Sequence, residues 1–500
     1  MSRAHDRFRG QRATVMGLGL FGGGVETARY LVERGMRVTV TDLRTAEKLQ
    51  ESLAALAGLG ITFELGAHRE RDFTDTDLVV ANPAVSPASP FLAAARAARV
   101  PVTSEMELFL EACAAKLVLV TGTQGKSSTS HAVDHFLRAA GFAVELGGNI
   151  GRSLLCALDR LTPERWVVLE VSSYQLEALS PAPLNGPHAL ARNVVAVCCT
   201  NVLSDHLERH GTPEAYEAAK QRLLELANPA TVIVLNTDDP RTSRWQPERG
   251  GVLRFSASGA ANARAVIRDG EFCSDGEPLG RVADLALPGD FQRENTLAAL
   301  AIARALGADP RKLRDAVATL AGLEHRLEDL GVRRGHRVWD NGVSTTPDST
   351  VAALRSRDAK VVLICGGQPK AGLPFDELVA EARDRVRCAI SFGAAAESLR
   401  AAFASAGLAA LAVRSVEESV RQAYATALPG DEILFSPACA SFDQYRNFRD
   451  RALAFRDALP AREGTRGGRG EVATSPGEAV PRPRGATVMV DGQRTGEVCP

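Results

Sequence analysis

A strand, loop and helix pattern near residue 120 constrains the fold of this chain more than any other feature. The apolar run at 117–120 leads into Gly122-Thr123-Gln124-Gly125-Lys126-Ser127-Ser128, and an amphipathic stretch follows at 130–137. Glycines allow backbone N–H groups to approach an anion closely, and the positive end of a helix strengthens that attraction. The pattern therefore predicts a phosphate-binding loop between a buried strand and a helix.

Two side chains of this loop suit a nucleoside triphosphate. A lysine at position 126 can reach the terminal phosphates, and the hydroxyl of Ser127 offers the oxygen ligand that Mg²⁺ prefers. The general pattern has a further glycine where this chain has Val120, so the match is the shorter Gly-x-x-Gly-Lys-Ser. The alternative is a glycine-rich turn with a solvated lysine.

Size and charge exclude several classes of protein. Five hundred residues, of which 45% are hydrophobic, are enough for two to four domains with real cores. The net charge of -1 gives no basic surface for nucleic acid or an anionic membrane. No apolar stretch reaches the roughly 18 residues of a membrane span, and the nine cysteines include no Cys-x-x-Cys pair. We expect a monomeric, cytoplasmic protein with reduced thiols.

The N-terminal segment contains a second glycine-rich turn. Gly17, Gly19 and Gly22 follow the segment Arg12-Ala13-Thr14-Val15-Met16, and Asp42 ends a strand-like run about 20 residues later. This spacing is typical of a Rossmann unit, in which a pyrophosphate lies at the start of a helix. A dinucleotide coenzyme, another nucleotide diphosphate and a turn that binds nothing all remain possible from these residues alone.

Polar side chains follow three further apolar runs. Glu170 ends the run at 166–169, His206 follows the run at 194–199, and Asp238 follows 232–235. Because ligands gather at the carboxyl ends of parallel strands, Glu170 is placed to hold a metal, although carboxylates also end strands by chance. His206 alone is more typical of a structural hydrogen bond, and nothing local distinguishes Lys220 from a solvated helix lysine.

Several short motifs spread over about residues 12–458 form one combined pattern. They are Gly122-Thr123-Gln124-Gly125-Lys126-Ser127, Gly148-Asn149-Ile150-Gly151, Glu170-Val171-Ser172-Ser173-Tyr174-Gln175, Asp205-His206-Leu207-Glu208-Arg209-His210, Lys220, Asn236-Thr237-Asp238-Asp239, His325-Arg326-Leu327-Glu328 and Ser436-Pro437-Ala438-Cys439-Ala440-Ser441-Phe442-Asp443. This combination resembles the Mur ligase family, and within it the members that add glutamate to UDP-N-acetylmuramoyl-L-alanine.

The resemblance implies an α/β fold of three domains. Residues 1–112 would form a Rossmann-like domain for the UDP-substrate, 113–321 a central P-loop ATPase, and 322–462 a C-terminal Rossmann-like domain for glutamate. Beyond them, Arg-Gly repeats, prolines and charges leave little to bury, so 463–500 is predicted to be a disordered tail.

The resemblance also implies an ATP-dependent acid–amino-acid ligase of peptidoglycan synthesis, which serves the cell wall, cell shape and cell division. ATP would phosphorylate the alanine carboxylate to an acyl phosphate, which the amino group of glutamate then attacks as ADP and phosphate leave. Phosphorylation is needed because a carboxylate is a poor acyl donor, and metal ions offset the gathered charge. D-glutamate is the expected amino acid, with L-glutamate as the alternative.

Residue roles follow from the matching positions. ATP would contact Gly122, Thr123, Gln124, Gly125, Lys126, Ser127, Ser128, Asn295 and Arg326. The UDP-substrate would contact Leu20, Phe21, Asp42, Arg44 and Asn149, and glutamate would contact Thr345, Lys370, Ser441 and Phe448. Two Mg²⁺ sites would use Ser127, Glu170, His206 and a carbamylated Lys220, and the catalytic residues would be Lys126, Glu170, His206 and Lys220.

Two segments depart from the family's usual pattern. Phe291-Gln292 stands where His-Asn is common, and Asp340-Asn341-Gly342-Val343-Ser344-Thr345-Thr346 stands where Asn-Asp-Ser-Lys-Ala-Thr-Asn is usual. The acid therefore comes one position early, and the lysine is replaced by Val343. These departures predict a nucleotide or amino-acid pocket that is braced differently.

Three other classes explain less of the chain. A folylpolyglutamate synthase shares the central ATPase but does not need the N-terminal glycine fingerprint. An NAD-dependent oxidoreductase explains Gly17 to Asp42 but leaves the phosphate loop and Glu170, His206 and Lys220 without a role. A non-catalytic nucleotide-binding module explains the loop but not the polar strand ends.

Overall fold

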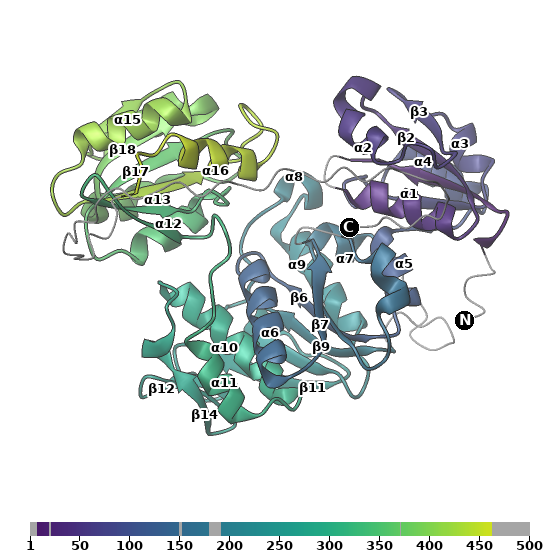
Figure 1. Ribbon diagram of the computed structural model, residues 1–500, viewed down its shortest axis with the longest axis horizontal. Helices are drawn as coiled ribbons and strands as arrows, with labels where there is room; N and C mark the ends of the chain where they lie inside the picture. The colour runs from purple at the N-terminus through teal and green to yellow at the C-terminus, as the bar shows by residue number, and fades with distance from the viewer. Residues whose placement is uncertain (1–7, 20–21, 150–152, 180–191, 371, 463–500) are drawn as a thin grey trace, which may run out of the picture.

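The computed structural model describes residues 8–19, 22–149, 153–179, 192–370 and 372–462. These residues form three sheets flanked by helices, each from a continuous part of the chain, and Figure 1 shows them as three lobes. We call them the first, central and third lobes. The expected three-domain α/β fold is confirmed, whereas the bounds at 112 and 321 stay predictions. The predicted tail at 463–500 and the predicted ligands Leu20 and Phe21 lie outside the described residues.

The first lobe is a parallel sheet with strand order β3-β2-β1-β4-β5. The strand order reverses at β1, so the glycine turn after this strand lies where open α/β sheets bind ligands. Its strands are β1 (Arg12–Met16), β2 (Arg37–Asp42), β3 (Thr62–Leu65), β4 (Leu78–Ala81) and β5 (Val102–Thr103). Its helices are α1 (Gly23–Glu33), η2 (Ala46–Leu49), α2 (Gln50–Ala54), α3 (Arg71–Thr74), α4 (Pro90–Ala97) and α5 (Glu105–Ala112).

The central lobe is a sheet of order β14-β13-β12-β11-β10-β9-β6-β8-β7, in which only the pairs of β13 are antiparallel. Its strands are β6 (Lys116–Thr121), β7 (Val144–Gly148), β8 (Trp166–Glu170), β9 (Val194–Cys199), β10 (Val232–Asn236), β11 (Gly251–Ser256), β12 (Ala265–Arg268), β13 (Glu271–Ser274) and β14 (Glu277–Arg281). Its helices are α6 (Lys126–Ala140), η3 (Leu155–Arg160), α7 (Ser173–Glu177), α8 (Leu207–His210), α9 (Pro213–Glu225), η4 (Thr242–Arg244), η5 (Val282–Asp284), α10 (Asp290–Ala305) and α11 (Pro310–Val317).

Strand β6 shows why the strands at the centre of this sheet contain unbroken apolar runs. Leu117 and Leu119 belong to the core that includes Tyr216 of α9, whereas Val118 and Val120 belong to the core that includes α6 and α10. Successive side chains point to opposite faces of a strand, so a sheet covered by helices on both faces buries every residue. The strands predicted at 117–120, 166–169 and 194–199 are confirmed as β6, β8 and β9.

The third lobe has strand order β15-β16-β20-β17-β18-β19, parallel except for the β15–β16 pair. Its strands are β15 (Glu328–Arg333), β16 (His336–Asp340), β17 (Val361–Gly366), β18 (Val386–Phe392), β19 (Ala410–Ala412) and β20 (Glu432–Ala438). Its helices are α12 (Pro347–Arg355), α13 (Asp376–Arg385), η6 (Gly393–Ala395), α14 (Ala396–Ser405), α15 (Val416–Thr426) and α16 (Phe448–Asp457).

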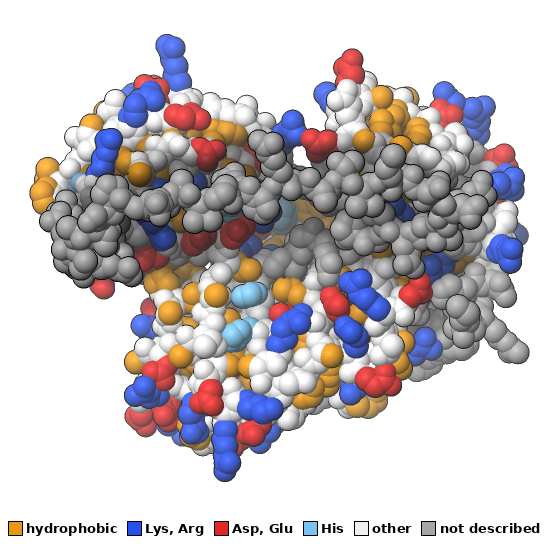
Figure 2. All heavy atoms as spheres, in the orientation of Figure 1, with side chains coloured by type: hydrophobic (Ala, Val, Ile, Leu, Met, Phe, Trp, Pro, Cys, Tyr) orange, Lys and Arg blue, Asp and Glu red, His pale blue; other side chains and the backbone are white. Residues whose placement is uncertain are grey.

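The distribution of charged side chains on the surface agrees with the near-zero net charge of the chain. On the face drawn in Figure 2, basic and acidic side chains are interspersed over the central lobe. None of the helices in the described ranges combines the length and the apolarity needed to cross a bilayer.

Candidate active site

The phosphate loop joins β6 to α6, and its two glycines cannot be replaced without moving their neighbours. Gly122 has φ 152°, and a Cβ there would lie 1.9 Å from the hydroxyl of Thr200. Gly125 has φ 78°, and its Cβ would lie 2.2 Å from the side-chain oxygen of Asn295. Since both positions combine a left-handed backbone with a close neighbour, only glycine fits. The same contact brings the predicted ATP ligand Asn295 to the loop.

The basic side chains of the loop region fold back onto it. The Nζ of Lys126 donates to the carbonyl oxygens of Gly122 and Thr123, both at 3.0 Å. Burial lowers the pKa of Lys126, against the raising effect of Glu170 and Asp205. Arg326 donates to the hydroxyl of Ser127 at 2.8 Å. The predicted ATP residues Lys126, Ser127 and Arg326 therefore meet at one place.

A strained turn presents Arg326 to the loop. Its neighbours His325 and Leu327 have φ values of 61° and 50°, which residues other than glycine rarely adopt. The Nδ1 of His325 lies 2.7 Å from the carboxylate of Asp340, and both side chains are buried. Arg456 donates to the same carboxylate at 2.7 Å. The contacts of the buried Asp340 carboxylate with His325 and Arg456 hold the turn in this conformation.

These contacts explain why an acid stands at position 340, in the segment that departs from the family's usual pattern. Asp340 is fully buried and accepts hydrogen bonds from Arg456 and from the backbone N–H of Gly342. The amide of Asn341 donates to the hydroxyl of Ser436 at 2.9 Å. In the other departing segment, Gln292 is buried and Phe291 packs against the core of the third lobe. The acid thus braces the turn before Arg326.

Glu170 ends β8 beside the phosphate loop, because β8 pairs with β6 in register from Lys116 to Val120. The carboxylate is 2% exposed, and its Oε1 accepts a hydrogen bond from the amide of Asn149 at 2.6 Å. Its Oε2 is buried without a hydrogen-bond partner within the described part of the chain. A buried anionic oxygen without a partner is costly, so this atom is suited to a cation.

His206 stands just before α8 with φ 53°. Its Nδ1 lies 3.3 Å from Glu208 and 3.4 Å from the hydroxyl of Tyr174, and its Nε2 lies 3.5 Å from Asp205. Burial lowers the pKa of His206, against the raising effect of Asp205. A neutral imidazole with a free lone pair is the form that binds a metal.

Asp205 joins the central lobe to the third lobe. Its Oδ1 accepts hydrogen bonds from the backbone N–H of His206 at 2.9 Å and from the Nζ of Lys370 at 3.0 Å. Burial raises the pKa of Asp205, but Lys370 and His206 outweigh it, so the pKa lies below its ordinary value. The predicted glutamate ligand Lys370 is therefore brought to the predicted metal ligand His206 through a residue that the sequence reasoning did not single out.

Lys220 is 1% exposed on the inner face of α9. Its Nζ donates to the carbonyl of Gly122 at 2.7 Å and lies 4.6 Å from the centre of the Tyr216 ring. Burial, together with the nearby charge of Lys126, lowers the pKa of Lys220 to about 7. The structure therefore places a reactive amine beneath the phosphate loop.

The predicted glutamate residues lie on segments of the third lobe that one arginine connects. Lys370 follows β17, Ser441 follows β20, and Phe448 begins α16. Arg451 of the same helix is fully buried, and burial lowers its pKa to about 10. Its guanidinium donates to the backbone carbonyls of Gly342, Ser344, Gly366, Cys439 and Ala440.

Sequence reasoning missed Arg451, although a signal for it exists. Phe448, Arg451 and Phe455 are spaced three and four residues apart, so they lie on one face of α16. Thr345 lies one residue after a carbonyl that Arg451 holds, and its neighbour Thr346 accepts a hydrogen bond from Gln124 at 3.2 Å. The third lobe therefore contacts the phosphate loop directly.

In the first lobe, Asp42 braces the glycine turn. Its carboxylate accepts hydrogen bonds from the backbone N–H groups of Leu18 at 2.9 Å, Gly19 at 3.2 Å and Arg44 at 2.8 Å. The guanidinium of Arg44 lies 3.6 Å from the same carboxylate. The structure thus brings Asp42 and Arg44 together, whereas Asn149 lies beside Glu170 in the central lobe.

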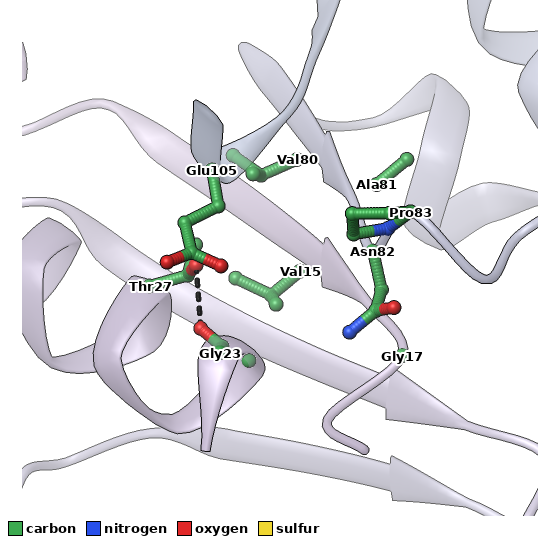
Figure 3. A pocket seen from close by; sticks show the side chains of 10 residues that line it. Val15, Gly17, Gly23, Thr27, Val80, Ala81, Asn82, Pro83 and Glu105 are labelled. Carbon is green, nitrogen blue, oxygen red and sulfur yellow. Dashed lines mark hydrogen bonds between the residues drawn. The ribbon is translucent and has the colours of Figure 1, made fainter. Parts of the chain in front are cut away.

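A pocket lies beside this turn, between β1, β4 and the start of α1, as Figure 3 shows. Glu105 of α5 points into it toward Gly23, where a Cβ would come within 2.7 Å of the carboxylate. Thr27 donates to the carbonyl of Gly23 at 2.8 Å. Burial raises the pKa of Glu105.

Arg209 of α8 is a third residue that sequence reasoning did not identify. It donates to Glu177 at 2.7 Å and stacks 4.9 Å from the centre of the Tyr174 ring. It also donates to backbone carbonyls of the first lobe, those of Pro83, Ala84 and Val85. With Asp205 in contact with Lys370, the segment 205–209 connects the central lobe to both others.

Two family models match the chain. One describes the Mur ligase middle domain and matches residues 120–303, and the other describes a Mur ligase MurD-like N-terminal domain and matches 11–104. A protein of Roseiflexus sp. (strain RS-1) named UDP-N-acetylmuramoylalanine--D-glutamate ligase is 38% identical over 465 residues, which are 89% of this chain and 98% of the relative. The chain belongs to the Mur ligase family. The family inferred from the motifs is confirmed.

Other Mur ligases are similar to this chain in sequence or in fold. A UDP-N-acetylmuramoylalanine--D-glutamate ligase of Symbiobacterium thermophilum is 36% identical over 90% of this chain and 98% of its own length. The crystal structure of UDP-N-acetylmuramate-alanine ligase MurC from Thermotoga maritima has a TM-score of 0.58 at 20% identity, covering 89% of this chain and 98% of that one. The MurF ligase of the same organism, solved in complex with ADP, has a TM-score of 0.55 at 17% identity, covering 92% and 98%.

Proposed function

We propose that this Mur ligase joins D-glutamate to UDP-N-acetylmuramoyl-L-alanine and converts ATP to ADP and phosphate. Relatives at 36–38% identity that are named for this D-glutamate ligation support the choice of substrates. The observation that carries the proposal is the meeting of three groups at one sheet edge: the phosphate loop, the Glu170 oxygen that has no partner in the described ranges, and the buried amine of Lys220. Phosphoryl transfer from a triphosphate to a carboxylate needs cations and phosphate ligands in one place.

The reaction has two steps. The alanine carboxylate oxygen attacks the γ-phosphorus of ATP, ADP leaves, and an acyl phosphate forms. The glutamate nitrogen then attacks the carbonyl carbon, loses its proton, and displaces phosphate as the amide bond forms. We assign Lys126, with Gly122 to Ser128 around it, to the phosphates of ATP, and Asn295 and Arg326 to further contacts with ATP. Lys126 would exchange its contacts with loop carbonyls for phosphate oxygens.

The residues present fit a divalent cation. The buried Oε2 of Glu170 has no hydrogen-bond partner among the described residues, and the lowered pKa of His206 favours the neutral imidazole that binds a metal. The hydroxyl of Ser127 adds a third oxygen or nitrogen donor, consistent with Mg²⁺ held between protein and phosphates. When bound, two Mg²⁺ ions would neutralise the charge of the transferring phosphoryl group.

Lys220 completes this donor set only if it is carbamylated. Among the described residues, no three His, Cys, Asp or Glu side chains form a metal site by themselves. An amine with a pKa of about 7 is largely neutral at physiological pH, and a neutral amine adds to CO₂ with loss of a proton. The resulting carbamate is an anion, which suits a position beside the phosphate loop and its cations.

Lys370 is proposed to pair with the distal carboxylate of glutamate, with Thr345, Ser441 and Phe448 around the amino acid. Lys370→Ala is expected to raise the KM for glutamate by roughly 10-fold or more, because a charge-assisted hydrogen bond contributes about 1.5–3 kcal/mol. The KM for ATP should change little. Steady-state phosphate release with each substrate varied in turn checks this, and an equal rise in both KM values would contradict the assignment.

We propose that the first lobe binds the UDP portion of the substrate through the turn that Asp42 braces. Titration calorimetry of the full chain is expected to show binding of UDP-N-acetylmuramoyl-L-alanine and no heat with NAD(P). Both ligands contain a pyrophosphate, so the glycine turn does not distinguish them, and we expect the choice to depend on the muramoyl contacts near Asn149. Binding of NAD(P) without any response to the UDP-sugar would contradict the assignment.

The proposed activity is tested by amino-acid-dependent phosphate release with ATP and UDP-N-acetylmuramoyl-L-alanine. D-glutamate, L-glutamate, L-lysine and meso-diaminopimelate are supplied side by side. Preference for D-glutamate supports the proposal, preference for L-glutamate overturns only the stereochemistry, and preference for a diamino acid overturns the glutamate site. Because ATP and a UDP-sugar are the substrates, we infer a cytoplasmic location, and we propose that the protein acts as a monomer.

A further inference from the structure

An ion pair between Asp205 and Lys370 spans the central and third lobes. The Nζ of Lys370 lies 3.0 Å from the Oδ1 of Asp205, and the two side chains are 19% and 10% exposed. Lys370 follows β17 of the third lobe, and Asp205 follows β9 of the central lobe beside His206. A positive and a negative group therefore face each other at the place where the amino-acid side and the phosphate side of the site meet.

A carboxylate of glutamate that binds Lys370 competes with Asp205 for the ammonium group of this lysine. When Lys370 turns to the substrate, Asp205 loses its cation in a largely buried position, and a buried charge without a partner is strongly unfavourable. Incoming glutamate also brings a group of opposite charge, its α-ammonium. The substrate can therefore supply a new partner to both members of the ion pair.

We propose that Asp205 binds the α-ammonium group of the incoming amino acid, so that the substrate enters by replacing the Asp205–Lys370 ion pair. This rests on the proposed glutamate ligase function. Asp205 is the fixed member of the pair, because its Oδ1 also accepts the backbone N–H of His206 at 2.9 Å. Lys370 is the mobile member, since its ammonium ends a flexible four-carbon stem.

The position of Asp205 suits this role. It directly precedes His206, which is proposed to bind a Mg²⁺ ion beside the transferring phosphoryl group. An ammonium group bound to Asp205 is therefore held near the carbonyl carbon that its nitrogen attacks after it loses a proton. The other charged groups around His206 are Glu208, at 3.3 Å from its Nδ1, and Lys370. Glu208 is half exposed and makes no ion pair with Lys370 in the described structure, so it serves as a matched control.

Glutarate, which is glutamate without its amino group, distinguishes two possible roles of Asp205: binding the ammonium group of the substrate and positioning Lys370. The experiment measures the KM for glutamate and the Ki of glutarate as a competitive inhibitor, for the wild-type protein and for Asp205→Asn. The variant is expected to raise the KM for glutamate about 10-fold or more, as for a lost charge-assisted hydrogen bond. The Ki of glutarate is expected not to rise, because glutarate has no ammonium group to lose and the variant has no buried carboxylate to leave unpaired.

Each outcome decides the proposal. Equal losses for glutamate and glutarate would mean that Asp205 acts only by positioning Lys370, and unchanged values for both would mean that it has no part in the site; either result overturns the proposal. Glu208→Gln should show no selective loss for glutamate, and a selective loss there equal to that of Asp205→Asn would also overturn it. Absence of glutamate-dependent turnover in the wild-type protein would instead overturn the proposed function itself.

Discussion

Lys126→Ala is expected to reduce amino-acid-dependent phosphate release by at least about 100-fold while the protein stays folded, in the range for loss of one preorganised donor to a developing charge. The Nζ of Lys126 donates to two carbonyl groups of its own loop, and the residue belongs to none of the apolar clusters of the described chain. Its removal therefore takes a cation from the phosphates and no apolar side chain from the core. Steady-state kinetics and thermal unfolding of the same preparation check the two parts of this expectation.

Lys116→Ala is the matched control for this prediction. Lys116 begins β6, at the opposite end of the strand that leads into the loop, and its Nζ lies 4.7 Å from the centre of the Trp166 ring. Its substitution should leave turnover near the wild-type value. Near-normal turnover of a folded Lys126→Ala protein would remove the phosphate-loop assignment.

Lys220→Ala is expected to lose most activity, at least about 100-fold, and to recover part of it when acetate or formate is added. The truncation leaves space beneath Gly122, where the Nζ of Lys220 now lies 2.7 Å from the carbonyl oxygen, and a small carboxylate there restores the anion that the carbamate supplies. Lys312→Ala, which removes an exposed lysine of α11, should need no rescue. Lack of rescue at every carboxylate concentration would count against the carbamate.

The pH dependence of the wild-type protein gives an independent check on the carbamate. The pKa of Lys220 is lowered to about 7, so the amine is mostly neutral above this pH and mostly protonated below it. Only the neutral amine adds to CO₂. At limiting bicarbonate, activity should therefore fall as the pH drops through about 7, and added bicarbonate should restore it. A loss of activity that bicarbonate does not affect would point to another titrating group.

The ends of strands were the most predictable parts of the site. Each buried strand reads as an apolar run, and polar residues at its carboxyl end stand out against that run. Glu170 and the phosphate loop were placed in this way, and the structure confirms that they end β8 and follow β6 at one edge of the central sheet. These positions can be predicted from local sequence because the length and the burial of a strand are both apparent from consecutive residues.

Lys220 and Arg451 were harder to place, because a basic residue in a helix is usually solvated. Lys220 lies four residues after Tyr216 and three before Leu223, and all three are buried on the inner face of α9. The spacing was present in the sequence, but it does not reveal which face of a helix meets the sheet. That choice depends on packing between residues about 100 positions apart, such as Lys220 and Gly122.

The departing segment at 340–346 could be noticed in the sequence but not explained from it. The role of its acid is seen only in the tertiary structure. There β16, α16 and the turn before β15 pack together, so that Asp340 contacts both His325 and Arg456. Likewise, nothing near Lys370 in the sequence indicates that its partner is Asp205, 165 residues away.

The sequence by itself determined the α/β class, the phosphate loop, the glycine turn and the family, because each depends on residues that are close together in the chain. The tertiary structure alone decided which basic side chains are buried, how Arg326 reaches Ser127, and that Asp205 faces Lys370. The physical reason is that burial and ion pairing depend on which distant elements pack against one another. Those contacts set the charge of Lys220 and the partner of Lys370, and with them the chemistry that the site can perform.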